Sequence, residues 1–243
     1  MTIDTTQPGA APPPPPMPQA PSAPSAASFR DPTTITRVLT IVLWVALALD
    51  VIAVASGLLE YNLLQAIQSG SITGSDMTAA ADANDFRQRL IGIGQIGMYV
   101  ITVIVFARWI YVLNANKTPL GAAALSFTPG WAVGWFFIPF ANLWKPYQAM
   151  KELWLVSADP LRWQQQQRSQ LLPWWWFLWL LANILGQLSF RLSFHATDIS
   201  DIVAANVASD LADSSSVALE AVAIILVGQI ARMQLARRPG GGV

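Results

Sequence analysis

Four stretches of the chain are apolar for about 20 residues and lack the polar face that helices of soluble proteins carry. They cover residues 38–58, 90–113, 171–190 and 216–235, each bounded by polar or turn-forming residues. A helix of about 20 apolar residues spans the hydrocarbon core of a bilayer. The pattern therefore predicts an all-α fold, an integral membrane four-helix bundle. Four buried helices of a soluble protein are the disfavoured alternative.

The segments that follow the first and third spans are polar. Residues 70–85 are small and polar and predict a loop. Residues 198–213 carry apolar side chains near helical spacing, which predicts a short amphipathic helix of its own. On the other face of that helix, Asp198 and Asp201 have the spacing to share a weakly bound cation, although a solvated acidic face is the favoured interpretation.

The segment from residue 127 to 157 is different, because its apolar part is only about half as long as a crossing requires. Both of its ends should lie on the same side of the membrane, since two spans precede it and two follow. We expect a shallow re-entrant arm, a break near Pro139 and then a helix in the membrane interface, bent by Pro146. A single kinked helix from Trp131 to Val156 that crosses obliquely is the alternative.

The interfacial helix is predicted from the spacing of its side chains. One stripe recurs at steps of three and four residues: Phe140, Leu143, Trp144, Tyr147, Met150 and Trp154. The opposite side is polar: Asn142, Lys145, Gln148, Lys151 and Glu152. Aromatic side chains and lysines of this kind favour the headgroup boundary. We expect contact with lipid or a partner through Trp131, Trp135, Trp144, Lys145, Tyr147, Lys151 and Trp154.

Composition agrees with a membrane protein and excludes several kinds of site. Of 243 residues, 53% are hydrophobic and 12% charged, with 11 tryptophans and a formal net charge of zero. The balance of charge gives no reason to expect a nucleic acid partner. The chain has no cysteine and one histidine, His195, which excludes thiolate sites and histidine-rich metal sites. No nucleotide-binding or hydrolase motif is present, so we expect neither a cofactor nor an enzyme.

The distribution of charge predicts the orientation. Lys and Arg concentrate on the cytoplasmic side of membrane proteins. With both termini inside, the inner side holds Arg30, Arg37, Arg108, Lys117, Lys145, Lys151, Arg162, Arg168, Arg232, Arg237 and Arg238. The outer side holds Arg87, Arg89 and Arg191 together with most of the acids. We therefore expect a multi-pass protein of the cell (plasma or inner) membrane, with cytoplasmic N- and C-termini.

Two tails flank the predicted membrane domain, which covers residues 36–236. Residues 1–35 are rich in Pro and Ala and contain "APPPPPMP", a composition that does not form a packed core. The tail is either a solvated tether, which we favour, or a docking site for a cytosolic protein that recognises proline. Residues 237–243 form a short basic, Gly-rich tail.

Two acids lie inside predicted spans, Asp50 in the first and Glu220 in the fourth. A carboxylate within a membrane is costly unless it is neutralised or paired, so such residues are functional candidates. The depths of the two differ by roughly 6 Å, close enough to meet. Gln95 and Gln187 lie at comparable levels and could line a polar cavity with them. The alternative is a hydrogen-bonded packing cluster that holds the spans together.

The 127–157 segment also carries a resemblance. Its run of rare residue types, "PGWAVGW" at 129–135, "FIP" at 137–139, "NLW" at 142–144 and then Pro146, Tyr147, Met150, Glu152 and Trp154, resembles the signature of a family of bacterial multi-pass membrane proteins, the domain of unknown function DUF4328. The resemblance covers the chain from about Thr36 to Leu235. It implies several spans and supplies neither an activity nor catalytic residues.

Two classes of function remain open. The favoured one is a non-enzymatic membrane scaffold or sensor that interacts with the lipid bilayer and with protein partners. The other is a small transporter or channel in which Asp50 and Glu220 bind protons or cations; four spans are few for such a pathway, which points to a homo-oligomer.

Overall fold

The computed structural model describes residues 28–239, and these residues form helices joined by turns, with no strand among them. Four helices are long and apolar enough to cross a membrane: α1 (Thr33–Gln68), α2 (Gly74–Ala115), α5 (Leu171–His195) and α6 (Ile199–Ala236). Between α2 and α5 lie α3 (Pro129–Gly134), α4 (Lys145–Ala158) and the 3₁₀ turns η1 (Trp135–Phe137), η2 (Ala141–Leu143) and η3 (Trp163–Gln165). The all-α helical bundle is thus confirmed. Most of the Pro-rich tail and the last four residues lie outside the described residues.

The long helices extend beyond the predicted spans, and two expectations for the connecting segments were wrong. α2 already begins at Gly74, so most of the expected polar loop is helix. Alanines within residues 79–83 are strong helix formers and explain this extension. The expected separate amphipathic helix is instead the first part of α6. Asp198 caps α6 by accepting hydrogen bonds from the backbone N–H groups of Ser200 and Asp201.

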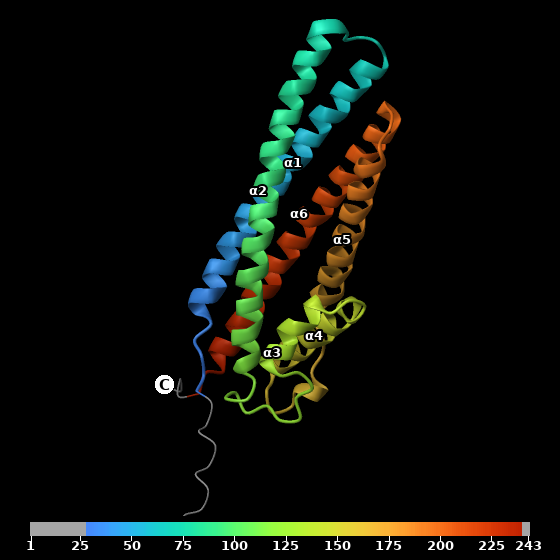
Figure 1. Ribbon diagram of the computed structural model, residues 1–243. Coiled ribbons are helices and arrows are strands. Elements are labelled where there is room, and N and C mark those ends of the chain that lie inside the picture. Colours follow the sequence, from blue (N-terminus) through green and yellow to red (C-terminus); the bar gives the residue numbers. More distant parts are fainter. Residues whose placement is uncertain (1–27, 240–243) are drawn as a thin grey trace, which may run out of the picture.

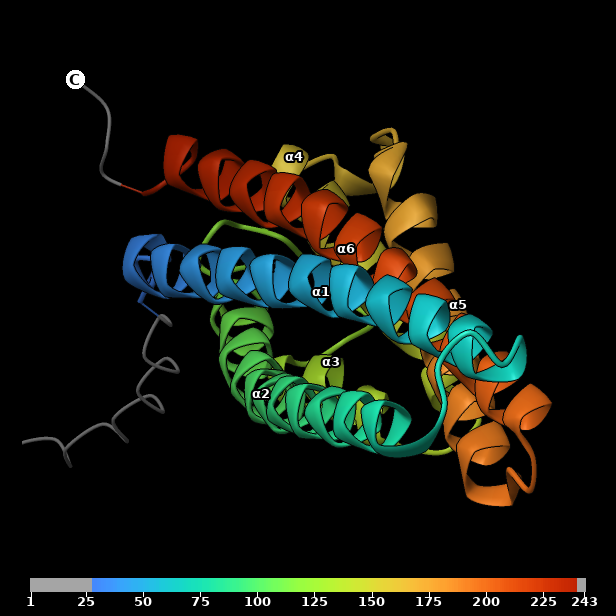
Figure 2. The ribbon, with the colours of Figure 1, turned by 90° about the horizontal axis from the view of Figure 1, so that it is seen from above.

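The four long helices pack as neighbours in the order α2, α1, α6, α5 (Figures 1 and 2). α1 lies against both α2 and α6, and α5 lies against α6. The short elements gather at one end, where α3 packs on α2 and α4 packs on α5 and α6. Both ends of the segment between α2 and α5 therefore lie at the same end of the bundle.

At this end α1 begins, α2 ends, α5 begins and α6 ends. We call it the basic pole after its Lys and Arg residues. The residues predicted to face the cytoplasm cluster toward it. The opposite end, with the α1–α2 and α5–α6 turns, is the acidic pole. Which side of a membrane each pole faces stays a prediction.

The best-packed part of the bundle is the half near the basic pole. Its core includes aromatic side chains of α2 and α5, such as Trp109, Trp175 and Trp176, together with Met150 and Leu153 of α4. Hydrophobic side chains of α1 and α6 complete it: Leu39, Leu43, Leu226, Val227 and Ile230. The inserted elements α3 and α4 thus form part of the core of this half.

Candidate functional site

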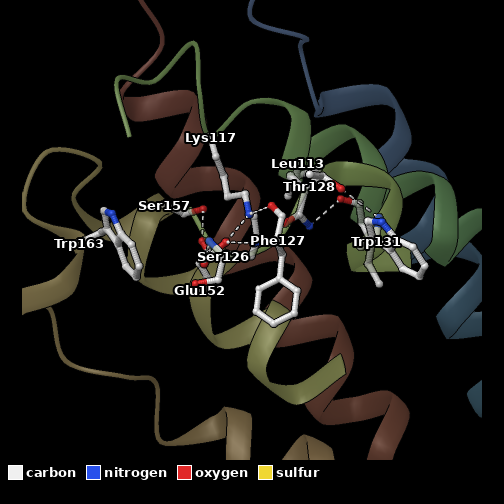
Figure 3. A network of polar contacts seen from close by, with 12 residues as sticks. Leu113, Lys117, Ser126, Phe127, Thr128, Trp131, Glu152, Ser157 and Trp163 are labelled. Atoms are coloured by element: carbon white, nitrogen blue, oxygen red, sulfur yellow. Dashed lines mark hydrogen bonds and ion pairs between the residues drawn. The ribbon is translucent and has the colours of Figure 1, made fainter. Parts of the chain in front are cut away.

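A buried ion pair joins the end of α2 to the middle of α4 (Figure 3). Lys117 follows directly after the C-terminal cap of α2, and its Nζ atom lies 2.6 Å from Oε1 of Glu152. The side chain of Lys117 is fully buried, and that of Glu152 is 5% exposed. Burial lowers the pKa of Lys117, although the hydrogen bond and the charge of Glu152 act in the opposite direction. From the sequence, Lys117 was counted among the charges of the inner side and Glu152 was placed on the polar side of the interfacial helix, without a prediction that the two pair.

The same two side chains also hold the loop that leads into α3. Lys117 Nζ donates to the carbonyl of Phe127 at 3.0 Å. Glu152 accepts from the backbone N–H groups of Ser126, at 2.7 Å, and Phe127, at 3.3 Å. Figure 3 shows these groups converging between the end of α2 and α4. The ion pair therefore determines where the 127–157 segment begins relative to the bundle.

A second buried network lies beside the ion pair and joins further elements. Gln234 of α6 donates to the carbonyl of Leu113 at 3.0 Å and to the hydroxyl of Ser157 at 3.1 Å. Asn116 donates to Gln234 at 3.0 Å, and it exchanges two hydrogen bonds of 2.8 Å with the backbone of Arg30. Because Asn116, Ser157 and Gln234 are buried, these bonds fasten α2, α4, α6 and the approach to α1 together.

The 127–157 segment has the predicted break but a different helical part. The helix α4 begins at Lys145, so Pro146 lies in its first turn, where no N–H is needed, and does not bend it. Phe140 and Leu143 lie ahead of α4, so the expected stripe does not belong to one helix. Met150 is buried, and the kinked helix from 131 to 156 does not form.

The break lies at Phe140, and its backbone conformation is strained. Phe140 has φ +64° and ψ −50°, and the N–H of Ala141 donates to the carbonyl of Pro139 at 2.8 Å. This is a γ-turn of the positive-φ form, which is rare and unfavourable for a bulky residue. The Phe140 side chain is nevertheless 79% exposed. Within the described residues, no burial of the ring compensates for the strain at Phe140.

The residues predicted to contact lipid or a partner are either exposed or half-buried. Trp131 and Trp144 are exposed, and they form with other large side chains what we call the exposed apolar set: Trp131, Phe137, Phe140, Leu143 and Trp144. Tyr147 and Trp154 are half-buried and pack against the core. The Trp135 ring lies beside that of Trp131, tilted by 33° with centroids 5.0 Å apart, and Lys145 Nζ lies 5.6 Å from the centroid of the Trp135 ring. Lys151 is half-buried on α4.

The segment rises along the bundle from the basic pole. Phe136 makes edge-to-face contacts with Phe106 of α2, at 6.0 Å between centroids, and with Trp179 of α5, at 6.4 Å. Phe106 and Trp179 lie eight or nine residues from the helix ends at this pole. At 1.5 Å per residue, Phe136 therefore reaches roughly 12–14 Å along the bundle.

The predicted intramembrane candidates are only partly brought together. Gln95 donates to Asp50 at 3.0 Å and to Asp213 of α6 at 2.9 Å, so one amide bridges two carboxylates. Glu220 follows Asp213 by seven residues on α6, and no hydrogen bond joins it to Asp50 or Gln95 among the described residues. Its Oε2 atom has no hydrogen-bond partner within residues 28–239. Gln187 lies apart, on the wall of a separate surface pocket along α5.

Further polar contacts continue from this cluster toward the acidic pole. Asn206 of α6 donates to Glu60 at 3.2 Å, and Arg87 of α2 donates to the hydroxyl of Ser56 at 2.8 Å. At Gly57, α6 comes so near that a Cβ atom would lie 1.7 Å from Oδ1 of Asp210. The interface of α1, α2 and α6 is therefore polar over much of this half.

Sequence reasoning missed the most buried polar groups. Lys117 and Glu152 are 35 positions apart in the chain, and each also fits a solvent-exposed position. Asp213 and Gln234 lie near or in an expected span, and neither was singled out. The sequence did contain one usable signal. Glu220 follows Asp213 by 7 positions, and Gln234 follows Glu220 by 14. Both intervals are near whole numbers of helical turns, so the three residues share one face of a helix.

One comparison with known proteins finds a match. The family described as "Domain of unknown function (DUF4328)" matches residues 73–232, a range that runs from α2 into α6 and contains the whole 127–157 segment. No curated protein and no solved structure matches the chain.

Proposed function

The chain belongs to the DUF4328 family, and from this premise we propose that it is a non-enzymatic membrane scaffold or sensor whose exposed apolar set contacts lipid or a protein partner. It acts in the cell membrane, with both termini in the cytoplasm. The membrane location in this proposal rests on four helices that are long and apolar enough to cross a membrane.

One observation carries the proposal: Phe140 is both strained and exposed. A bulky residue at positive φ costs about 1–3 kcal/mol and persists where the surroundings impose it, often at functional sites. The buried pair Lys117–Glu152 and the packed helix α4 supply such surroundings. A large ring presented to the outside at this cost is expected to have a binding role.

The location of the segment supports membrane contact. If the basic pole lies at a membrane surface, a rise of roughly 12 Å carries Phe136 below the headgroups into the apolar region. Irregular backbone at such depth must be covered by protein. Phe106 and Trp179 cover it from two sides here. These contacts support the proposal of a re-entrant arm that packs against its own bundle.

Photo-crosslinking tests the proposal with a matched control. We would place benzoylphenylalanine at Phe140 and, separately, at Leu161, which is 80% exposed in the loop before α5. We expect position 140 to form adducts with lipid or with one protein of defined mass, several-fold above position 161. Equal and low yields at both positions, with both variants folded, would refute the proposal.

A thiol experiment tests the orientation. Because the chain has no cysteine, single cysteines at Ser126, Gln167 and Ser71 report sidedness cleanly. All three side chains are exposed. We expect Ser126→Cys and Gln167→Cys to react from the cytoplasm and Ser71→Cys from outside. Opposite sides for the first two would contradict the re-entrant arm.

A second candidate function is favoured by one specific observation, the amide of Gln95 shared by Asp50 and Asp213. Carboxylates so placed between apolar helices are candidates for binding a proton or a cation during transport. In liposomes, the protein should then carry protons or alkali cations, and Asp50→Asn should abolish the flux. Flux equal to that of empty vesicles would remove this candidate and leave the scaffold.

A further inference from the structure

A pocket of about 410 Å³ lies between the start of α1 and the last turns of α2 at the basic pole. Arg30 and Arg108 are among the residues that line it, and the guanidinium groups of both lie close to the neighbouring ring of Tyr111, with Cζ at 5.6 Å and 5.9 Å from its centroid. Both side chains are exposed, and neither forms an ion pair with a carboxylate of residues 28–239. Two cations held at one ring attract an anion.

The pocket also contains one negative charge, which is already engaged elsewhere. Asp31 accepts a hydrogen bond from the N–H of Thr33 at 2.8 Å and pairs with Arg238 at 3.6 Å. The lining therefore keeps a net positive charge with Arg238 at its edge. The hydroxyl of Thr34, also in the lining, adds a donor that suits a phosphate oxygen.

The remaining walls are apolar. Ile35 and Val38 of α1 and Val112 of α2 line the pocket at levels between Arg30, which precedes α1, and Arg108, seven residues before the end of α2. Val38 is 41% exposed, and Ile41, one turn further along α1, is 57% exposed. The site thus places two arginines next to exposed apolar side chains that continue along two spanning helices. Such a site fits an amphiphile better than a soluble anion.

We propose that this pocket binds the phosphodiester headgroup of an anionic phospholipid from the leaflet at the basic pole. Arg30 and Arg108 bind the phosphate oxygens, since planar guanidinium groups form paired hydrogen bonds with phosphate. One acyl chain follows Ile35, Val38 and Ile41. Basic pockets between helices at the cytoplasmic face bind anionic headgroups in this way. The inference rests on the membrane location in the proposed function, but none of these residues belongs to the 127–157 segment, so it does not depend on contact through the exposed apolar set.

Native mass spectrometry of the full chain tests the inference. The protein is released from micelles that contain phosphatidylglycerol or phosphatidylcholine with identical acyl chains, and the retained lipid is counted. We expect a preference for phosphatidylglycerol that falls about tenfold or more in Arg30→Gln/Arg108→Gln. The matched control is Arg37→Gln/Arg168→Gln, which removes the same charge from two exposed arginines near the same pole and should keep the preference.

Two further measurements distinguish a bound lipid from a bound soluble anion and from a general effect of charge. Asp31→Asn should bind phosphatidylglycerol more tightly, because it removes the opposing charge while keeping an acceptor for the N–H of Thr33. This variant tests the inference even if the double variant does not fold. Inorganic phosphate at millimolar concentration should not displace the lipid. The inference is overturned if phosphate displaces it fully, if both double variants lose the preference equally, or if Asp31→Asn weakens binding.

Discussion

Replacing Glu152 by glutamine removes the negative charge of the buried ion pair and leaves its shape nearly unchanged. The carbonyl oxygen of glutamine can still accept from the N–H of Ser126, which lies 2.7 Å from the carboxylate in the parent chain. The ammonium group of Lys117, however, remains fully buried with the carbonyl of Phe127 as its main partner. The substitution therefore isolates the loss of charge compensation.

The expected loss of stability follows from the burial of both groups. Removing one partner of a buried pair costs about 3–5 kcal/mol, because the other charge stays in a low-dielectric environment. Retained hydrogen bonds place Glu152→Gln near the lower limit, at about 3 kcal/mol. In Lys117→Met/Glu152→Gln the unpaired charge is gone, and we expect a loss of about 1 kcal/mol relative to the parent chain.

Reversible unfolding in mixed micelles, followed by tryptophan fluorescence, measures these differences. The matched control is Asp159→Asn, which breaks the pair Arg162–Asp159, 3.5 Å long, at the same pole; its arginine side chain is 74% exposed and its aspartate 24%. An exposed pair contributes about 0–1 kcal/mol. A loss for Glu152→Gln no larger than that for Asp159→Asn, or a double variant less stable than the single one, would refute the reasoning.

The loss should depend on pH in a defined direction. In the folded variant, the buried ammonium has a pKa below its ordinary value of 10.5, since burial lowers it and Glu152 no longer opposes this. The unfolded chain then binds more protons than the folded one as the pH approaches 10.5. Stability of the variant should therefore rise with pH in the alkaline range, relative to Lys117→Met/Glu152→Gln. A constant difference would contradict this.

Three other substitutions test separate features in the same unfolding assay. Gly57→Ala should destabilise the protein by about 1 kcal/mol, because the new Cβ displaces the carboxylate of Asp210. In an Asp210→Ala background the same substitution should stabilise the protein by a similar amount, because the clash is gone and Ala favours a helix over Gly. Gln95→Leu should cost about 1–3 kcal/mol by leaving Asp50 and Asp213 without their shared donor, whereas Asn183→Leu, at an exposed amide, should change little. Phe140→Gly should stabilise the protein by about 1 kcal/mol while it removes the most exposed ring of the exposed apolar set; a loss of stability would show that the γ-turn is not strained.

The all-α bundle, its four long apolar helices and the break near Pro139 could all be predicted from the sequence. Each of these follows from properties of neighbouring residues: a run of apolar side chains, or a proline that removes a backbone donor. The segregation of Lys and Arg toward one pole is likewise visible in the order of the segments. The predicted identity of the family also follows from local residue types, and the match over residues 73–232 confirms it.

Which polar groups are buried, and with which partner, depends on the packing of helices that are distant in the sequence. Glu152 and Lys145 both belong to α4, yet Glu152 points into the core toward Lys117, while Lys145 lies over the rings of Phe127 and Trp135. Likewise, Gln95 meets Asp213, 118 positions later in the chain, and Gln187 is on a different surface. A charged residue can lie on the buried or on the exposed side of a helix, and the residues next to it in the sequence do not identify its partner. Its position is determined by how helices distant in sequence pack, because burial penalises every charge left without a partner.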